Sequence, residues 1–148
     1  SRKLKYVKAE GEDFNSIVTG IMQQKGNIHM NIGTPLTSEE IAAAALCDKN
    51  DRYQLIRHAV DQRVIDGYKL WKNNYIAYDI ANHGFKYSHL YDQSEVEQFV
   101  SYMQHQLDTV EPEINREDLR RIFIDIYANP VFTKELLEKE RRTGNILL

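Results

Sequence analysis

The sequence contains one cysteine, Cys47, and three prolines in 148 residues. A single cysteine cannot form a disulfide within the chain, which excludes a disulfide-stabilised fold and fits a reducing compartment. No second cysteine and no histidine stands at the spacing of a zinc motif from Cys47. We therefore expect Cys47 to be a small buried side chain rather than a reactive thiol.

The chain also lacks long apolar runs and an excess of basic residues. It has no stretch of about 18 apolar residues and no signal-peptide pattern, so we expect neither a transmembrane helix nor export. Its 19 lysines and arginines stand against 22 acidic residues, which gives a net charge of −3. This balance gives no global electrostatic reason to expect a nucleic acid or an anionic membrane as partner. We expect a cytoplasmic protein whose binding depends on local features.

Most of the local patterns in the sequence indicate helices. Thr37 and Glu40 form a capping box that predicts the start of a helix before the alanine-rich residues 41–47. Asn50 offers an N-cap for a second helix, which Gly67 can end. Its apolar stripe consists of Tyr53, Ile56, Val60 and Val64. Further helices are predicted over 13–24 and 68–82, after a box at Ser94 and Glu97, from Asn115 until Pro130 stops the run, and after Thr133.

Residues 26–32 carry a different pattern. Ile28, Met30 and Ile32 alternate with polar residues, and Gly33 and Pro35 follow, which predicts a half-buried strand. Residues 3–9 could supply a second strand, with the helix at 13–24 as crossover. We expect an α+β fold that is mainly α, with five to seven helices and one or two short strands.

Two strands rarely form an independently stable sheet. We therefore expect residues 26–32 to lie at the edge of a larger sheet encoded upstream. The chain begins at Ser1 without an initiator methionine, which agrees with a single domain over residues 1–148 that is the C-terminal fragment of a larger protein.

Four segments carry a resemblance to a known family. They are GEDFNSIVTG at 11–20, KGNIHMNIG at 25–33, NYIAYD at 74–79 and YANP at 127–130. In this order they resemble the C-terminal half of bacterial 1-acylglycerol-3-phosphate acyltransferase-like proteins, over about residues 10–130. The resemblance implies that the strand ending in Gly33-Thr34-Pro35 follows the catalytic part of the sheet.

The resemblance also implies a reaction, the transfer of an acyl chain from an acyl thioester to the hydroxyl of a lysophospholipid. The family uses a His-x-x-x-x-Asp motif, in which the histidine is the general base. None of the five histidines here has an aspartate at that spacing, and the family's Glu-Gly-Thr motif is also absent. We therefore assign no catalytic, cofactor-binding or metal-binding residue. We expect the fragment to be inactive alone, with the upstream catalytic part of the parent chain as its partner.

Three His-x-x-Asp pairs invite a catalytic or metal-binding interpretation. They are His58 with Asp61, His89 with Asp92, and His105 with Asp108. Side chains three residues apart are neighbours on a helix, so exposed helix pairs explain the first and third. A zinc site needs three or four converging ligands, and no His-x-x-x-His spacing occurs.

Aromatic residues concentrate between Gly67 and Tyr91. On a helix over 68–82, Trp71, Tyr75 and Tyr78 share one face and Lys72 lies beside them. One interpretation is a helix docked on the rest of the fold, with its hydroxyls bonded to polar groups. The other is an interfacial surface of Trp71, Lys72, Tyr75 and Tyr78 that contacts lipid headgroups, peripheral to the inner face of the membrane.

Two alternatives belong to other functional classes. The helix pair after Leu36 resembles the opening of a winged-helix DNA-binding motif. Its second helix and lead-in carry equal numbers of opposite charges, so little counterion-release affinity is expected and nucleic acid is an unlikely partner. These charges are those of Lys49, Arg52, Arg57 and Arg63 against Asp48, Asp51, Asp61 and Asp66. The other alternative is a helical partner-binding module, which an exposed apolar face would favour.

Overall fold

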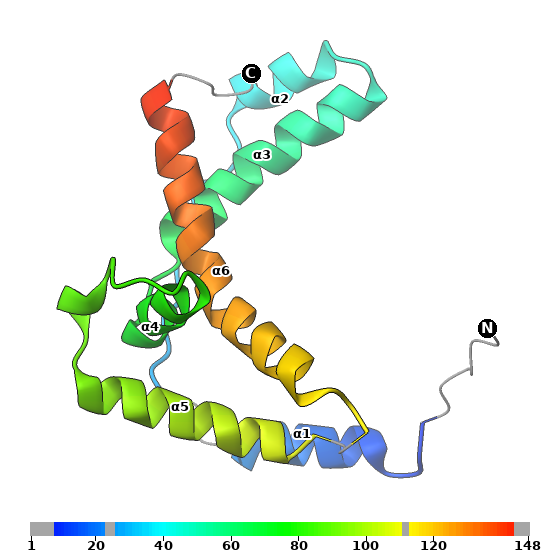
Figure 1. Cartoon of the computed structure of the whole chain (residues 1–148). Coiled ribbons are helices and arrows are strands. Elements are labelled where there is room, and N and C mark those ends of the chain that lie inside the picture. The colour runs from blue at the N-terminus through cyan, green and yellow to red at the C-terminus, as the bar shows by residue number, and fades with distance from the viewer. Residues whose placement is uncertain (1–7, 23–25, 111–112, 144–148) are drawn as a thin grey trace. The chain divides into compact units, whose positions relative to one another are not determined.

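The computed structural model describes residues 8–22, 26–110 and 113–143 (Figure 1). Its helices are α1 (Glu12–Met22), α2 (Ser38–Ala45), α3 (Lys49–Gly67), α4 (Lys72–Ala81), the short 3-10 helix η1 (Ser88–Leu90), α5 (Gln93–Asp108) and α6 (Arg116–Thr143). The chain divides into two compact units, Ser1–Met30 with α1 and Asn31–Leu148 with the other helices. The predicted helical content and number of helices are confirmed.

The predicted strand is wrong, because no β-strand occurs in the residues that the structure describes. Residues 26–32 have no regular secondary structure, and of the predicted partner strand, residues 3–7 lie outside the described ranges. Alternation of apolar residues predicts which side chains share a face, but a strand exists only where another strand pairs with it. The two residues that follow Gly33 are bonded to a side chain of α3 instead. The guanidinium of Arg63 donates to Thr34 Oγ1 at 3.2 Å and to the Pro35 carbonyl at 3.4 Å.

Helices α2 and α3 form a pair that polar contacts hold together. The capping box is confirmed, since the Glu40 N–H donates to Thr37 Oγ1 at 3.2 Å and the Thr37 N–H to Glu40 Oε2 at 2.7 Å. The N-cap of α3 is Asp48 and not the predicted Asn50. Aspartate at this position bonds two backbone N–H groups at once, those of residues 50 and 51.

Gly67 ends α3 as predicted, and the position has no room for a side chain. A Cβ built there would lie 1.9 Å from Asn31 Nδ2 and 3.2 Å from Asn31 Cβ. The residue in this place must therefore be glycine unless Asn31 moves, so the close approach of residue 31 to the end of α3 depends on it.

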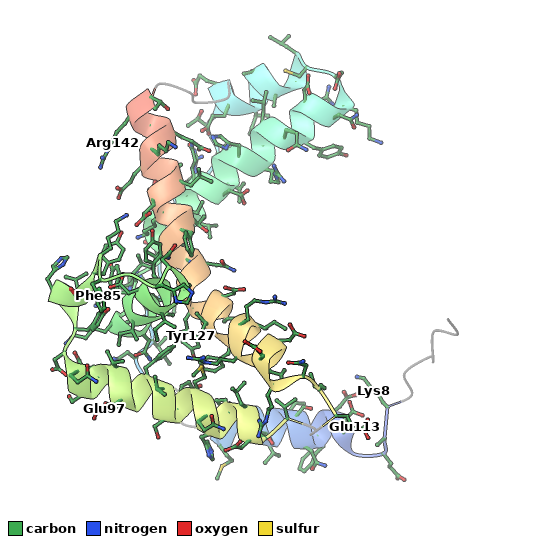
Figure 2. All side chains as sticks on the ribbon, in the orientation of Figure 1. Lys8, Phe85, Glu97, Glu113, Tyr127 and Arg142 are labelled. Atoms are coloured by element: carbon green, nitrogen blue, oxygen red, sulfur yellow. The ribbon has the colours of Figure 1, made fainter. Side chains whose placement is uncertain are left out.

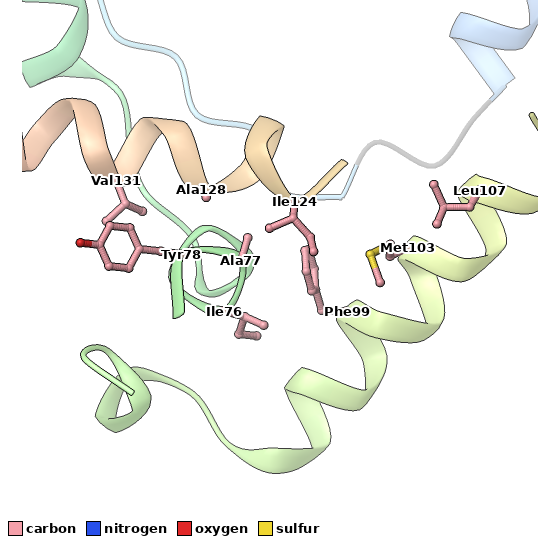
Figure 3. Packing of buried hydrophobic residues seen from close by; sticks show 9 residues of the cluster. All are labelled: Ile76, Ala77, Tyr78, Phe99, Met103, Leu107, Ile124, Ala128 and Val131. Carbon is pink, nitrogen blue, oxygen red and sulfur yellow. The ribbon is translucent and has the colours of Figure 1, made fainter. Parts of the chain in front are cut away.

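The hydrophobic core lies between α4, α5 and α6 (Figure 3). Helices α5 and α6 each contribute one apolar face, which for α5 repeats at intervals of four residues, whereas α4 contributes three consecutive residues and is buried on more than one face. The core residues are Ile76, Ala77 and Tyr78 from α4, Phe99, Met103 and Leu107 from α5, and Ile124, Ala128 and Val131 from α6. The Phe99 ring meets the Tyr127 ring edge-on, with centroids 5.4 Å apart.

The start of α5 lies two residues before the predicted position. The capping box is formed by Asp92 and Glu95 instead of Ser94 and Glu97, and Ser94 donates its hydroxyl proton to Asp92 at 2.7 Å. Asp92 is a better acceptor for backbone N–H groups than a serine hydroxyl, because it is charged and lies at the positive end of the helix. The predicted cap of α6 is confirmed, since Asn115 Oδ1 accepts two backbone N–H groups.

Helix α6 does not stop at Pro130 but continues to Thr143, so that the two predicted helices are one. Proline removes one N–H donor and costs a free helix about 3 kcal/mol. Here two side chains from outside α6 donate hydrogen bonds to backbone carbonyls at and near Pro130. Asn74 donates to the Tyr127 carbonyl at 2.9 Å and the Tyr68 hydroxyl donates to the Pro130 carbonyl at 2.5 Å. Tertiary contacts therefore hold the helix together where the local sequence predicts a break.

Candidate functional site

The four residues predicted to form an interfacial surface do not share one face. Lys72 is exposed and donates to Glu95 on α5 at 2.7 Å. Tyr78 is a core residue, and the half-buried Tyr75 packs its ring against Tyr87. Trp71 is half-buried at the start of α4. Lys72 alone is therefore fully exposed, Trp71 and Tyr75 are each half-buried, and Tyr78 packs into the core.

A shallow pocket of about 430 Å³ lies beside Trp71. Ile126 and Pro130 of α6 form its opposite wall. The ammonium group of Lys69 stands 4.2 Å from the centroid of the Trp71 ring, which is a cation–π contact. The pocket combines an aromatic ring, an exposed isoleucine and one lysine, a composition that suits contact with an apolar chain bearing an anionic group.

The hydroxyls of Tyr78 and Tyr87 converge on Glu135 of α6. Its carboxylate accepts from the Tyr78 hydroxyl at 2.9 Å, from Lys86 Nζ at 2.6 Å and from the Tyr87 hydroxyl. Burial opposes ionisation of Glu135, but these donors outweigh it and lower the pKa of the carboxyl. Burial and the neighbouring carboxylate raise the pKa of the Tyr87 hydroxyl. A carboxylate held by three donors is a poor general base, so this cluster ties α4, the following loop and α6 together.

Another carboxylate, Asp79, lies in the last turn of α4 and, unlike the half-buried Glu135, is only 3% exposed. Its Oδ2 accepts the Tyr87 N–H at 2.9 Å and the Tyr91 hydroxyl at 2.7 Å. Burial first, and then the bond to Asp79, raise the pKa of Tyr91 to about 12. Among the described residues no donor reaches Asp79 Oδ1.

A pocket of about 540 Å³ adjoins Asp79. The loop after α4 forms one side of it, and Figure 2 shows Phe85 on that loop. At the end of α4 the backbone of His83 is left-handed, with φ of 50°. The N–H groups of His83 and Gly84 return to the carbonyls of Ile80 and Asp79, which is the arrangement that usually places glycine where His83 stands.

The three His-x-x-Asp pairs are not joined by hydrogen bonds that would make them catalytic. Asp61 lies beside Arg57, Asp92 caps α5, and Asp108 accepts from Arg116 at 2.6 Å. His58 is bonded to Gln62 at 2.8 Å. Within the described ranges, no group of three or more histidine, cysteine, aspartate or glutamate side chains could hold a metal ion.

Two of the four basic side chains considered for the α2–α3 pair, Arg52 and Arg63, are engaged in bonds to the protein itself. Arg52 donates to three carbonyls at the end of α2, and Arg63 donates to Glu40 at 2.8 Å and to the Ala59 carbonyl. Arginines used in this way cannot also read bases or phosphates. This arrangement gives the DNA-binding alternative no support.

Sequence reasoning missed Asp79 and Glu135. The signal for Asp79 was present, because it is the only charged residue between Asn74 and Asn82, a stretch that is otherwise apolar or aromatic. A charge in such a stretch is buried only if it is bonded, and the nearby tyrosines are suitable donors. Glu135 is distant from those tyrosines in sequence and carried no comparable signal.

None of the helices in the part of the chain that the structure describes combines the length and hydropathy needed to cross a lipid bilayer. A scan against protein-family models finds no match, and searches of curated proteins and of solved structures find no similar protein.

Proposed function

We propose that this chain is the C-terminal part of a glycerophospholipid acyltransferase of the 1-acylglycerol-3-phosphate acyltransferase type. In this proposal the catalytic His-x-x-x-x-Asp motif lies upstream of the chain. The parent protein transfers an acyl group from an acyl thioester to a lysophospholipid hydroxyl. The helices described above are its supporting part.

The observation that carries the proposal is the exposure of the segment that resembles the family's strand. The side chains of Ile28, Met30 and Ile32 are 78%, 82% and 89% exposed. Three alternating apolar residues left in water cost burial energy of about 1.5–3 kcal/mol each relative to a covered position. A strand of the parent's sheet that pairs with this segment would cover them.

Helix α3 supports a second candidate, a helical module that binds a partner protein. Tyr53, Val60 and Val64 of its apolar stripe are exposed, and α3 has no buried residue. Both candidates require another polypeptide to cover apolar surface. They differ in the reaction, because only the first predicts acyl transfer by the parent.

The first experiment compares this chain with the longer gene product. Acyl transfer from an acyl thioester to lysophosphatidate is measured for both. We expect no transfer by residues 1–148 alone and transfer by the longer product, which must contain an upstream His-x-x-x-x-Asp. Transfer by the isolated chain, or a longer product without that motif, would contradict the proposal.

The second experiment tests the proposed strand within the longer product. Replacing Ile28, Met30 and Ile32 by lysine places charges on the face that the sheet would cover, so we expect loss of activity and of soluble protein. The matched control replaces the adjacent exposed Asn27 by lysine and should retain activity. Equal effects of the two sets would show that no face of this segment is covered.

We further propose that Trp71 and Lys72 contact the membrane that holds the lysophospholipid, so that the parent is cytoplasmic and peripheral to the membrane's inner face. Three features support this contact: Lys72 is exposed, Trp71 is half-exposed, and the ammonium group of Lys69 lies over the Trp71 ring. Co-sedimentation with anionic vesicles should weaken in Trp71→Ala and in Lys72→Glu. Unchanged co-sedimentation of both variants would remove the membrane contact but not the acyl transfer.

A further inference from the structure

The end of α4 holds a buried carboxylate oxygen that is left without a donor. Asp79 is 3% exposed, and both donors that reach it, the Tyr87 N–H and the Tyr91 hydroxyl, bond the same oxygen, Oδ2. No donor in the described residues reaches Oδ1. A buried acceptor without a partner destabilises the folded chain, and more strongly so when it is charged. The oxygen is therefore a place where a group from outside the chain would gain a strong hydrogen bond.

The adjoining pocket has the size and the walls of a small-molecule site. Its volume of about 540 Å³ lies within the range of roughly 300–1,000 Å³ that such sites occupy. Ile76, Ile80 and Val96 give it an apolar wall beside Asp79. A ligand that reaches the carboxylate could thus bury a short apolar chain at the same time.

The charges around the pocket favour a cation. Asp79 and Asp92 both line it, whereas none of its lining residues is a lysine or arginine. The carbonyl end of α4 adds negative potential at the same place, while the N–H end of α5, which Asp92 caps, adds potential of the opposite sign. The described residues offer no set of three side chains for a metal ion, so the cation that fits is organic.

We propose that this pocket binds a primary ammonium group carried on a short apolar chain. The ammonium donates to Asp79 Oδ1, and the chain lies against Ile76, Ile80 and Val96. The proposal does not depend on acyl transfer, because it concerns binding by residues 1–148 alone. Two sources present the primary ammonium group, a free alkylamine and the ethanolamine headgroup of a lipid, in which two carbons separate the ammonium from a phosphate.

The test uses three probes of one chain length, n-hexylamine, 1-hexanol and hexanoate, titrated into the 148-residue protein at pH 7 and followed by two-dimensional amide NMR. Hexylamine should shift resonances of residues 76–96 and bind about tenfold more tightly than hexanol, because a hydrogen bond to a charged donor is roughly twice as strong as a neutral one. Hexanoate should not bind. Equal binding of all three probes, or no binding of hexylamine, would overturn the proposal.

A variant then assigns the effect to the carboxylate. Asp79→Asn keeps an oxygen for Tyr87 and Tyr91 but removes the charge, so we expect hexylamine to bind about tenfold more weakly, with hexanol unchanged. Asp61→Asn, the same substitution on an exposed face of α3, is the matched control and should bind like the original protein. If Asp79→Asn does not fold, the comparison of the three probes on the unaltered protein still decides the question.

Competition by lipids separates the two sources. Short-chain lysophosphatidylethanolamine carries a primary ammonium group, whereas lysophosphatidylcholine has no N–H to donate. Displacement of hexylamine by the ethanolamine lipid alone would identify a lipid headgroup as the occupant. Hexylamine binding that neither lipid displaces would identify a free amine. Displacement by both lipids alike would contradict a site that requires an N–H donor.

Discussion

Two parts of the unit Asn31–Leu148 differ in how they are held. The α4–α5–α6 part has an apolar core of nine residues and two carboxylates bonded by tyrosines, the buried Asp79 and the half-buried Glu135. The α2–α3 part has one buried residue, Ala44, and its helices meet through capping and arginine contacts. The first part is therefore stabilised mainly by burial of apolar side chains, and the second mainly by hydrogen bonds.

The difference indicates where stability and where binding surface lie. Burial of apolar area is the dominant favourable term in folding, so the core region should set the stability of the chain. Helix α3 exposes Tyr53, Val60 and Val64 and gains little from burial. A region with few buried apolar contacts opens more easily, and its exposed apolar face is available to another polypeptide.

The largest effect should come from the core. Phe99→Ala removes a ring that is 2% exposed and should lower the free energy of unfolding by about 3–5 kcal/mol. Tyr53→Ala, its counterpart on α3, should change it by less than about 0.5 kcal/mol. Urea denaturation followed by circular dichroism measures both. Similar losses of unfolding free energy in the two variants would contradict the difference between the two parts.

The next effect concerns the bonded carboxylate that joins α4 to α6. Glu135→Gln should cost about 2 kcal/mol, because a charged acceptor for three donors is lost. The pKa of Glu135 is lowered from 4.5 in the folded chain, so its contribution is complete above about pH 4.5 and is lost as pH falls through the lower folded value. Unfolding measured from pH 7 to pH 3 should show a smaller loss of stability in the glutamine variant. A parallel pH profile would contradict this role of Glu135.

A smaller effect is expected for the arginine that organises the α2–α3 part. Arg63 bonds Thr34, Pro35, Ala59 and Glu40 with one planar group. Arg63→Ala should cost about 1–2 kcal/mol. Arg63→Lys should restore less than half of it, because an ammonium group cannot present the same fork of donors. Full rescue by lysine in urea denaturation would show that charge alone is sufficient.

The smallest effect is expected where α3 meets α6. Arg141 donates to both oxygens of Asp66, at 2.9 Å and 2.6 Å, and both side chains are largely exposed. Exposed pairs contribute about 0.2–1 kcal/mol, so Asp66→Asn should lower the free energy of unfolding by about 0.5 kcal/mol. The effect should diminish in 1 M salt. A loss above about 2 kcal/mol would mean that this pair, and not the core, holds α3 in place.

Local signals in the sequence predicted much of the fold. The Thr37 capping box, the glycine end of α3 and the Asn115 cap depend on residues within one turn of each other, and the structure confirms them. The alternation at 28–32 and the proline at 130 led to wrong predictions. Strand pairing, and the hydrogen bonds that stabilise a helix around a proline, depend on residues far away in sequence. Tyr68 lies 62 positions from the carbonyl of Pro130 that it bonds.

The candidate sites follow the same rule. The aromatic spacing correctly placed Trp71 and Tyr75 on α4 or at its start, but it could not show that Tyr78 turns toward Glu135, a residue 57 positions away. The orphaned oxygen of Asp79 is visible only after every nearby donor has been placed. Sequence patterns therefore predict which residues share a helix face, whereas the partners across helices require the structure.

Hydrogen exchange tests most directly two linked claims: the core of this chain folds without another polypeptide, and its exposed apolar surface is covered by one. In residues 1–148 alone, amides of α5 and of α6 around Ile124 should be protected to near the global free energy of unfolding. Amides of α3 and of residues 28–32 should exchange far faster, and both should become protected in the longer gene product that we propose. Equal protection of α3, residues 28–32 and α5 in the isolated chain would contradict the account.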